Sequence, residues 1–307
     1  MQSYTSIPIF VAVVENGSFS AAAQKLLITK SAVSKRIHLL EEELGCRLLN
    51  RTTRRLSLTE AGKQYYEYAS QSLTLAQQGI DLVTELQGKP RGRLKITAPM
   101  SFGGNHIAPL LSEFLSYYPD IQVDLHLEDK MVDLVDEGFD LGVRIGHLPV
   151  SNLIAKRLTT CRSILCASND YIQRYGEPEA PKDLRHHNCL RYTYYRGGHH
   201  WEFENATGQF NVAPQGNLAI NNSEAIRKAL LAGVGIAQMP TFLISKDIKL
   251  GQLQPIMTQY TLPVHAIYAV FPDKRHLPLK VRTFIDFLSQ QFAPDMPYWD
   301  KAIFGKQ

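Results

Sequence analysis

Basic side chains that could contact a polyanion are concentrated between residues 25 and 63. This segment holds nine Lys and Arg residues and only four Glu residues, a net charge of +5 over 39 residues. The whole chain of 307 residues carries a net charge of only +4, from 33 basic and 29 acidic residues. A local excess of this kind on a helical pattern predicts a surface for a polyanion such as double-stranded DNA.

The residues after Thr29 have the spacing of a helix with one apolar face. The apolar positions recur at intervals of 4, 3 and 4, at Val33, Ile37, Leu40 and Leu44. Thr29 is typical of a helix N-cap, and Gly45 is typical of the position just past a helix C-terminus. A second, short helix is expected over residues 20–27, capped by Ser20.

Two helices joined by a short turn predict a helix-turn-helix whose second helix enters the major groove. The face of that helix opposite its apolar positions is small, polar and basic, so we expect it to face DNA. The predicted contact residues are Thr29, Lys30, Ser31, Ser34 and Lys35. A small helical module with a coincidentally basic face would have the same apolar spacing and stays an alternative.

Residues 48–58 alternate between apolar and polar side chains at their end and carry three arginines around a turn. This pattern favours a winged hairpin whose tip meets phosphates or the minor groove. The residues that we expect to contact DNA here are Arg51, Thr52 and Arg54.

A long helix is expected from Thr59 to about Gln87. Apolar positions recur along it at intervals of 3 and 4, at Tyr66, Ala69, Leu73, Ala76, Ile80 and Val83. This is a heptad seam over about two and a half repeats. Because nothing upstream is large enough to cover the seam, we interpret it as a dimerisation surface. Packing of the seam on the chain's own second domain is the alternative.

Strands and helices alternate after the break at residues 88–92. Strands are expected at 94–98, 121–127, 141–145, 164–167, 188–191, 235–239 and 266–271, and helices at 106–117, 131–137, 224–231 and 279–292. This order predicts an α/β domain with largely parallel sheets. The expected organisation is a DNA-binding domain over residues 1–58, a linker helix and hinge over 59–90, and a second domain over 91–307.

Polar residues at strand-to-helix turns of the second domain could bind an anion. Ser101 and Phe102 follow the first strand, Asn222 and Ser223 precede a helix, and Thr241 follows another strand. Helix N-termini present free N–H groups and a partial positive charge, which suits a carboxylate. Arg144 could add a counter-charge. Alternatively, the turn residues only cap their helices, and Arg144 forms an internal ion pair.

Other classes of site find no support in the residues. The pairs His186–His187 and His199–His200 have no third ligand at metal spacing, Ser101 lacks the glycines of a nucleophile elbow, and Cys166 has no base partner. Gly233-Val234-Gly235 is half of a dinucleotide fingerprint and follows a helix. We therefore expect no catalysis, no metal and no cofactor. The longest early aliphatic stretch is too short for a membrane span, and the four cysteines show no paired spacing, which together favour a cytoplasmic location.

A family resemblance is carried by motifs that occur in order through the chain. The first group is FVAVVENGSFSAAA (residues 10–23), SAVS (31–34), LLEEELG (39–45), RTTR (51–54) and LTEAG (58–62). This combination resembles the winged helix-turn-helix of the LysR-type transcriptional regulators. The second group resembles their effector domain and comprises DLGVRIG (140–146), residues 190–201, AGVGIA (232–237) and VRTFIDFL (281–288).

The resemblance implies an effector domain with the periplasmic-binding-protein fold, made of two α/β subdomains. By position, one subdomain would hold residues 91–161 and 267–296, and the other 162–266. A small effector, often a carboxylate, would bind between them at a cleft that includes Ser101 and Phe102. The resemblance also implies a homodimer or homotetramer, and RNA polymerase is a candidate partner. The tail from Pro294 has no expected role.

The expected function is that of a sequence-specific DNA-binding regulator of transcription whose activity a small molecule modulates. An enzyme that converts a metabolite and carries a DNA-binding head is the alternative, and a solute-binding protein is a more distant one.

Overall fold

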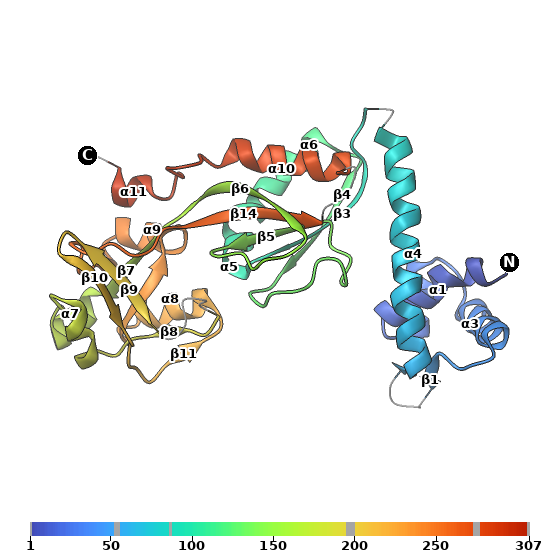
Figure 1. Cartoon of the computed structure of the whole chain (residues 1–307), viewed down its shortest axis with the longest axis horizontal. Coiled ribbons are helices and arrows are strands. Elements are labelled where there is room, and N and C mark those ends of the chain that lie inside the picture. Colours follow the sequence, from blue (N-terminus) through green and yellow to red (C-terminus); the bar gives the residue numbers. More distant parts are fainter. Residues whose placement is uncertain (1, 52–55, 86–87, 195–199, 273–276, 306–307) are drawn as a thin grey trace. The chain divides into compact units, whose positions relative to one another are not determined.

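The computed structural model describes residues 2–51, 56–85, 88–194, 200–272 and 277–305 (Figure 1). The chain divides into two compact units, one up to Gly88 and one from Lys89 onward.

The N-terminal unit contains a series of helices and a two-stranded hairpin. They are α1 (Gln2–Glu15), α2 (Phe19–Lys25), α3 (Lys30–Leu44), β1 (Leu49–Arg51), β2 (Leu56–Leu58) and α4 (Glu60–Glu85). Strands β1 and β2 pair antiparallel. The N-cap of α2 is Ser18 and not Ser20, because the Ser18 side chain accepts hydrogen bonds from the N–H groups of Ser20 and Ala21.

Buried side chains from α1, α2, α3 and the hairpin form one core in this unit. It includes Phe10, Val13, Val33, Ile37 and Leu40. Among the described residues, no single helix is long and apolar enough to cross a membrane. The segment of α1 from Thr5 and α2, which are bent by 120° relative to each other, reach that length and apolar composition only as a pair. The apolar residues of that pair are the ones that build this core.

The C-terminal unit contains two sheets of different design. The first has the strand order β4-β3-β5-β14-β6, with β3 (Gly92–Ala98), β4 (Ile121–Leu127), β5 (Leu141–Ile145), β6 (Leu153–Cys161) and β14 (His265–Pro272). The second has the order β12-β7-β13, with β7 (Ser163–Ser168), β12 (Ile236–Pro240) and β13 (Leu253–Pro255). We call the two halves built on these sheets lobe 1 and lobe 2.

The expectation of largely parallel sheets was wrong. Strand β3 is parallel to β4 and β5, but β14 is antiparallel to β5 and β6, and all pairs in the sheet of lobe 2 are antiparallel. The chain leaves lobe 1 through β6 and returns through β14. Two neighbouring strands that leave and return must run in opposite directions.

Helices and smaller pairs complete the two lobes. Lobe 1 has α5 (Met100–Phe102), a π-helical turn (Gly103–Ile107), a 3-10 turn (Ala108–Leu110), α6 (Leu111–Tyr117) and α10 (Leu279–Gln291). The helices of lobe 2 are α7 (Asn169–Tyr175), the 3-10 helix η3 (Pro181–His186), α8 (Ser223–Leu231) and α9 (Thr241–Lys249). Lobe 2 also has the parallel pair β8 (Arg191–Tyr192) and β11 (Ala219–Ile220) and the hairpin β9 (Trp201–Asn205) and β10 (Gly208–Val212). The chain ends with α11 (Lys301–Phe304). The helix expected at residues 131–137 is a series of turns.

Candidate functional site

The predicted recognition surface lies on α3 and its N-cap. Lys30, Ser31 and Lys35 are exposed, and Ser34 is half-buried. Thr29 accepts a hydrogen bond from the Ala32 N–H at 3.2 Å, and its Oγ1 lies 3.0 Å from Ser31 Oγ. The cap therefore fixes the start of the helix, and the two lysines remain available at the surface.

Leu27 is a feature of the turn that the sequence patterns did not reveal. Its side chain is 93% exposed, and its backbone has φ of 55°, in the left-handed region. A residue with a Cβ is strained in that conformation by roughly 1–2 kcal/mol. The left-handed conformation ends α2, so that the chain turns into α3 within a few residues.

The hairpin is attached to α3 by a buried carboxylate. Glu41 Oε1 accepts hydrogen bonds from the N–H groups of Leu48 at 2.9 Å and Leu49 at 3.1 Å. This contact positions β1, which ends at Arg51. Of the residues expected to contact DNA on the hairpin, Thr52 and Arg54 lie outside the described residues, and only the backbone of Arg51 is described.

The heptad seam of α4 divides into two parts. Its first part is used inside the chain: Ala69 is buried in the core of the N-terminal unit, and Tyr66 and Leu73 pack against that core. The expectation that nothing upstream covers the seam was therefore wrong for these three residues, because the core formed by the upstream helices and the hairpin extends along α4 as far as Leu73. Ala76, Ile80 and Val83 are exposed.

A cavity of about 650 Å³ lies between the two lobes of the C-terminal unit. Four of the six residues expected to bind an anion line it: Ser101, Phe102, Arg144 and Ser223. Ser101 Oγ in lobe 1 is 2.9 Å from Ser223 Oγ at the start of α8 in lobe 2. The side chain of Arg144 is buried, and its Nη1 donates to the Val143 carbonyl at 3.3 Å.

The other two expected residues have structural roles next to the cavity. The Asn222 side chain caps α8 by accepting from the Ala225 N–H at 2.9 Å. Thr241 is fully buried, and its Oγ1 lies 2.5 Å from Asp300 Oδ1 and 3.1 Å from the Arg162 carbonyl oxygen. Neither belongs to the described residues that line the cavity. The partner of Thr241 comes from the C-terminal tail, 59 residues later in the chain.

Asp129 is a cavity residue that the sequence analysis missed. Its Oδ1 accepts from the Met100 N–H at 2.8 Å, and its Oδ2 is buried without a hydrogen-bond partner among the described residues. Burial raises the pKa of Asp129, against the lowering effect of the hydrogen bond from Met100. Its position two residues after β4 was the available signal, because ligands bind beyond the carboxyl ends of parallel strands.

Charges of both signs surround the cavity. The cationic residues in its lining are Lys130, Arg144 and Arg191, and the acidic ones are Glu128, Asp129 and Glu202. His147 and His265 meet there edge to face with ring centroids 5.3 Å apart, and burial together with His147 lowers the pKa of His265. The cavity therefore offers hydrogen-bond donors and acceptors for a small polar molecule.

The described residues contain no group of three metal-binding side chains. Cys161, Cys166 and Cys189 are buried, and burial raises the pKa of all three thiols, that of Cys161 to about 12. A thiol with a raised pKa is a poor nucleophile, so these cysteines are unsuited to catalysis.

Comparisons with known proteins cover both units. Residues 5–63 match the family described as "Bacterial regulatory helix-turn-helix protein, lysR family", and residues 87–293 match "LysR substrate binding domain". The chain is 39% identical over 296 residues to an HTH-type transcriptional regulator of Xanthomonas campestris pv. campestris, with 94% of this chain and 86% of that protein covered. It is 36% identical to the regulator PtxR of Pseudomonas aeruginosa, with 92% and 91% covered.

Solved structures give the same result. The full-length Vibrio cholerae virulence activator AphB has a TM-score of 0.62 and 30% identity, with 92% of this chain and 97% of that chain covered. CrgA of Neisseria meningitidis, a LysR-type transcriptional regulator, has a TM-score of 0.61 and 33% identity, with 93% and 97% covered.

Proposed function

Because the chain belongs to the LysR-type transcriptional regulators, we propose that it reads an operator with α3 and responds to a small anionic effector in the cavity between its lobes. The family makes it a DNA-binding transcriptional regulator with an effector-binding domain, and not an enzyme. Under this proposal, residues 1–58 bind DNA, residues 59–90 link and dimerise, and residues 91–307 sense the effector.

The DNA-binding part of the proposal rests on the exposed face of α3. Lys30, Ser31, Ser34 and Lys35 point away from the core that Val33 and the other apolar residues of α3 form. Side chains near the N-terminus of a recognition helix contact base edges, and basic residues on the neighbouring hairpin contact phosphates. Arg51, Thr52 and Arg54 are proposed for the second role.

The effector part is carried by one observation: two serine hydroxyls from different lobes, Ser101 and Ser223, meet at the cavity wall 2.9 Å apart. Ser223 is the first residue of α8, whose N-terminal N–H groups favour an anion. Arg144 adds a buried cationic side chain to the same lining. A carboxylate bound here would contact both lobes at once.

Thermal-shift screening of small carboxylates against the full chain tests this part. A carboxylate that raises the unfolding midpoint is then incubated with the protein and quantified by chromatography. Binding without consumption is expected of an effector. Consumption of the compound would contradict the proposal, and so would a screen in which no carboxylate raises the unfolding midpoint.

Self-association through the second half of α4 is also part of the proposal. Ala76, Ile80 and Val83 extend past the core of the N-terminal unit and offer an apolar surface to another copy of the chain. A homodimer or homotetramer, RNA polymerase as a partner and a cytoplasmic location are the assignments that fit a regulator of this family.

A further inference from the structure

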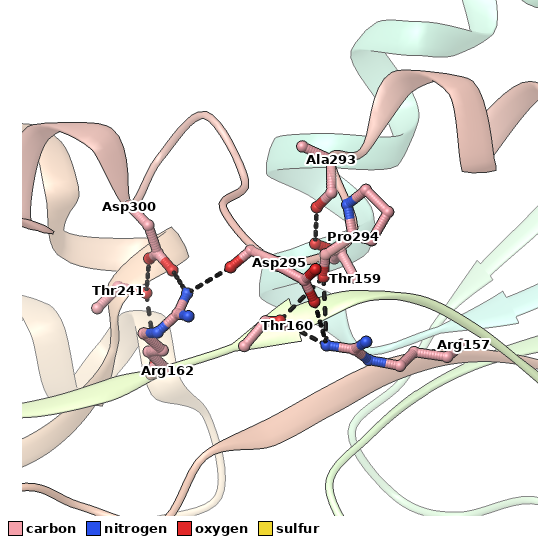
Figure 2. Close-up of polar contacts among 9 residues, drawn as sticks. All are labelled: Arg157, Thr159, Thr160, Arg162, Thr241, Ala293, Pro294, Asp295 and Asp300. Atoms are coloured by element: carbon pink, nitrogen blue, oxygen red, sulfur yellow. Dashed lines mark hydrogen bonds and ion pairs between the residues drawn. The ribbon is translucent and has the colours of Figure 1, made fainter. Parts of the chain in front are cut away.

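The tail after Ala293 follows α10 and lies beyond residues 87–293, the part that matches the effector-domain family. It runs from lobe 1, past the point where the chain crosses between the lobes, to α11 beside α9 of lobe 2 (Figures 1 and 2). We call residues 294–304 the strap.

The first set of contacts holds the strap to the crossing segment, where β6 leads into β7. The hydroxyl of Thr159 donates to the carbonyl of Ala293, the residue directly before the strap, at 2.6 Å, and that of Thr160 donates to the Pro294 carbonyl at 2.9 Å (Figure 2). Arg162 Nη1 donates to the Asp295 carbonyl at 2.9 Å. The crossing segment is thereby tied to the end of lobe 1.

The second set anchors the far end of the strap in lobe 2. Asp300 is fully buried, and its carboxylate forms an ion pair with Arg162 Nη1 at 2.7 Å. Its other oxygen lies 2.5 Å from the hydroxyl of Thr241, the first residue of α9 (Figure 2). A buried carboxylate needs this pairing, because an unpaired charge in a protein interior is costly.

The third set places aromatic rings of the strap behind the cavity wall. Phe102 of lobe 1 and Phe242 of lobe 2 both line the cavity. The Trp299 ring, itself buried, lies against both, with centroid distances of 5.8 Å and 6.4 Å. The Tyr298 hydroxyl lies 2.6 Å from His106 Nδ1, and His106 Nε2 donates to the Phe242 carbonyl at 3.1 Å.

We propose that the strap sets the relative position of the two lobes and so positions Phe102 and Phe242 at the cavity. A movement of one lobe against the other would have to break the contacts at Thr159 and Thr160 or those at Thr241 and Asp300, since each pair holds one end of the same short segment. In regulators, rigid-body movements of this kind transmit ligand binding. The role in sensing rests on the proposed effector cavity, whereas the mechanical role rests on the strap contacts alone.

A triple variant, Thr159→Val, Thr160→Val and Thr241→Val, removes the hydroxyls that hold the strap and nearly preserves side-chain volume. Thr97→Val is the matched control, because Thr97 is equally buried in lobe 1 and its hydroxyl has no hydrogen-bond partner among the described residues. The first measurement is amide hydrogen exchange of residues 294–304 in the full chain. Exchange should rise on the order of a hundredfold in the triple variant, since each hydroxyl bond contributes roughly a fivefold factor.

The second measurement is the distance between the lobes. Spin labels are placed on exposed positions, Arg282→Cys of α10 and Lys182→Cys of lobe 2, in a chain with Cys46→Ser. Labelled chain is diluted into unlabelled chain so that pairs within one chain dominate. The distribution should be narrow in the parent and in Thr97→Val, and broad or shifted in the triple variant.

Two outcomes would overturn the proposal. One is a strap that exchanges faster while the distance distribution stays that of Thr97→Val, which would make the strap a passive cover. The other is unchanged exchange, which would show that these hydroxyls do not hold it. Thr241→Val alone is measured in parallel in case the triple variant does not fold, and both readouts must move in the same direction. Neither measurement uses effector or DNA, so failure here leaves the proposed function intact.

Discussion

Ser101 Oγ lies 2.9 Å from Ser223 Oγ, although 122 residues separate the two in the chain. Ser101 belongs to the turn after β3 in lobe 1, and Ser223 begins α8 in lobe 2. Their contact is a polar connection between the lobes at the cavity wall. A ligand oxygen that accepts hydrogen bonds from both hydroxyls would replace a connection that the free protein already has.

The first prediction is that Ser101→Ala weakens effector binding about tenfold, which corresponds to ~1.4 kcal/mol, the size of one good hydrogen bond. Operator binding by the free protein should stay close to normal. Calorimetric titration with a carboxylate from the screen, followed by a DNA gel shift, checks both. Ser116→Ala, an exposed serine on α6, is the control. Equal affinity of Ser101→Ala and the parent protein would place the effector elsewhere.

Lys35→Ala should weaken operator binding by on the order of 1–3 kcal/mol if Lys35 contacts a base edge. Fluorescence anisotropy with operator and scrambled DNA at several salt concentrations makes the distinction. An equal loss on both DNAs with a reduced salt dependence would assign Lys35 to a phosphate. Lys249→Ala, an exposed lysine on α9 of the C-terminal unit, should behave like the parent. No change in any of these quantities would remove Lys35 from the interface.

The third prediction concerns the end of α4. Ile80→Glu together with Val83→Glu should dissociate the oligomer, because like charges would meet at an apolar contact. Both side chains are exposed in the single chain, at 59% and 64%, so the fold of the N-terminal unit should survive. Leu73→Glu is the contrasting variant and should instead destabilise this unit, since Leu73 packs on its core. Sedimentation velocity and urea unfolding separate the two effects, and an unchanged oligomer of the first variant would contradict the assignment.

Leu27→Asn should stabilise the N-terminal unit by about 1 kcal/mol. Asn tolerates the left-handed conformation better than Leu, and the exposed leucine side chain loses little packing when replaced. Urea unfolding of the full chain, followed by circular dichroism, measures the change in the free energy of unfolding. Leu250→Asn replaces another exposed leucine whose φ is −83°, and it should leave stability nearly unchanged. A loss of stability in Leu27→Asn would mean that the side chain packs on something in solution.

His106 should make the stability of the C-terminal unit pH-dependent. Burial, partly offset by the hydrogen bond to the Phe242 carbonyl, lowers its pKa to about 4 from the usual 6.5. Because the folded state holds the neutral ring, its contribution is complete above pH 6.5 and is lost as the pH falls from 6.5 towards 4. The loss amounts to roughly 3 kcal/mol at most.

Urea unfolding between pH 4 and 7 checks this prediction by comparison with His106→Gln. The variant should have a shallower pH dependence over that range, while His38→Gln, at an exposed position, should match the parent. Identical slopes for the parent and His106→Gln would show that His106 titrates normally in the folded protein.

Local patterns were sufficient for most of the elements. The regularly spaced apolar residues of α3, from Val33 to Leu40, face the core of the N-terminal unit. Thr29 caps that helix, and Gly45 follows it with φ of 66°. These features depend on residues within a few positions of one another. Strand direction was different: the antiparallel pairing of β14 with β5 and β6 depends on where the chain crosses between lobes, which spacing along the sequence does not specify.

The sequence by itself determined the DNA-binding unit, the α/β class of the second unit and the turn that carries Ser101, because each follows from short-range periodicity, capping or an ordered set of motifs. Only the tertiary structure decided which polar turns share a cavity. Asp129 lines it and accepts a hydrogen bond from the Met100 N–H, whereas the Thr241 hydroxyl is hydrogen-bonded to Asp300 of the strap. It also decided that α4 places Ala69 in its own core and leaves Val83 exposed. The physical reason is that a side chain's role depends on which distant segment covers it, and apolar or polar character along the chain does not encode that partner.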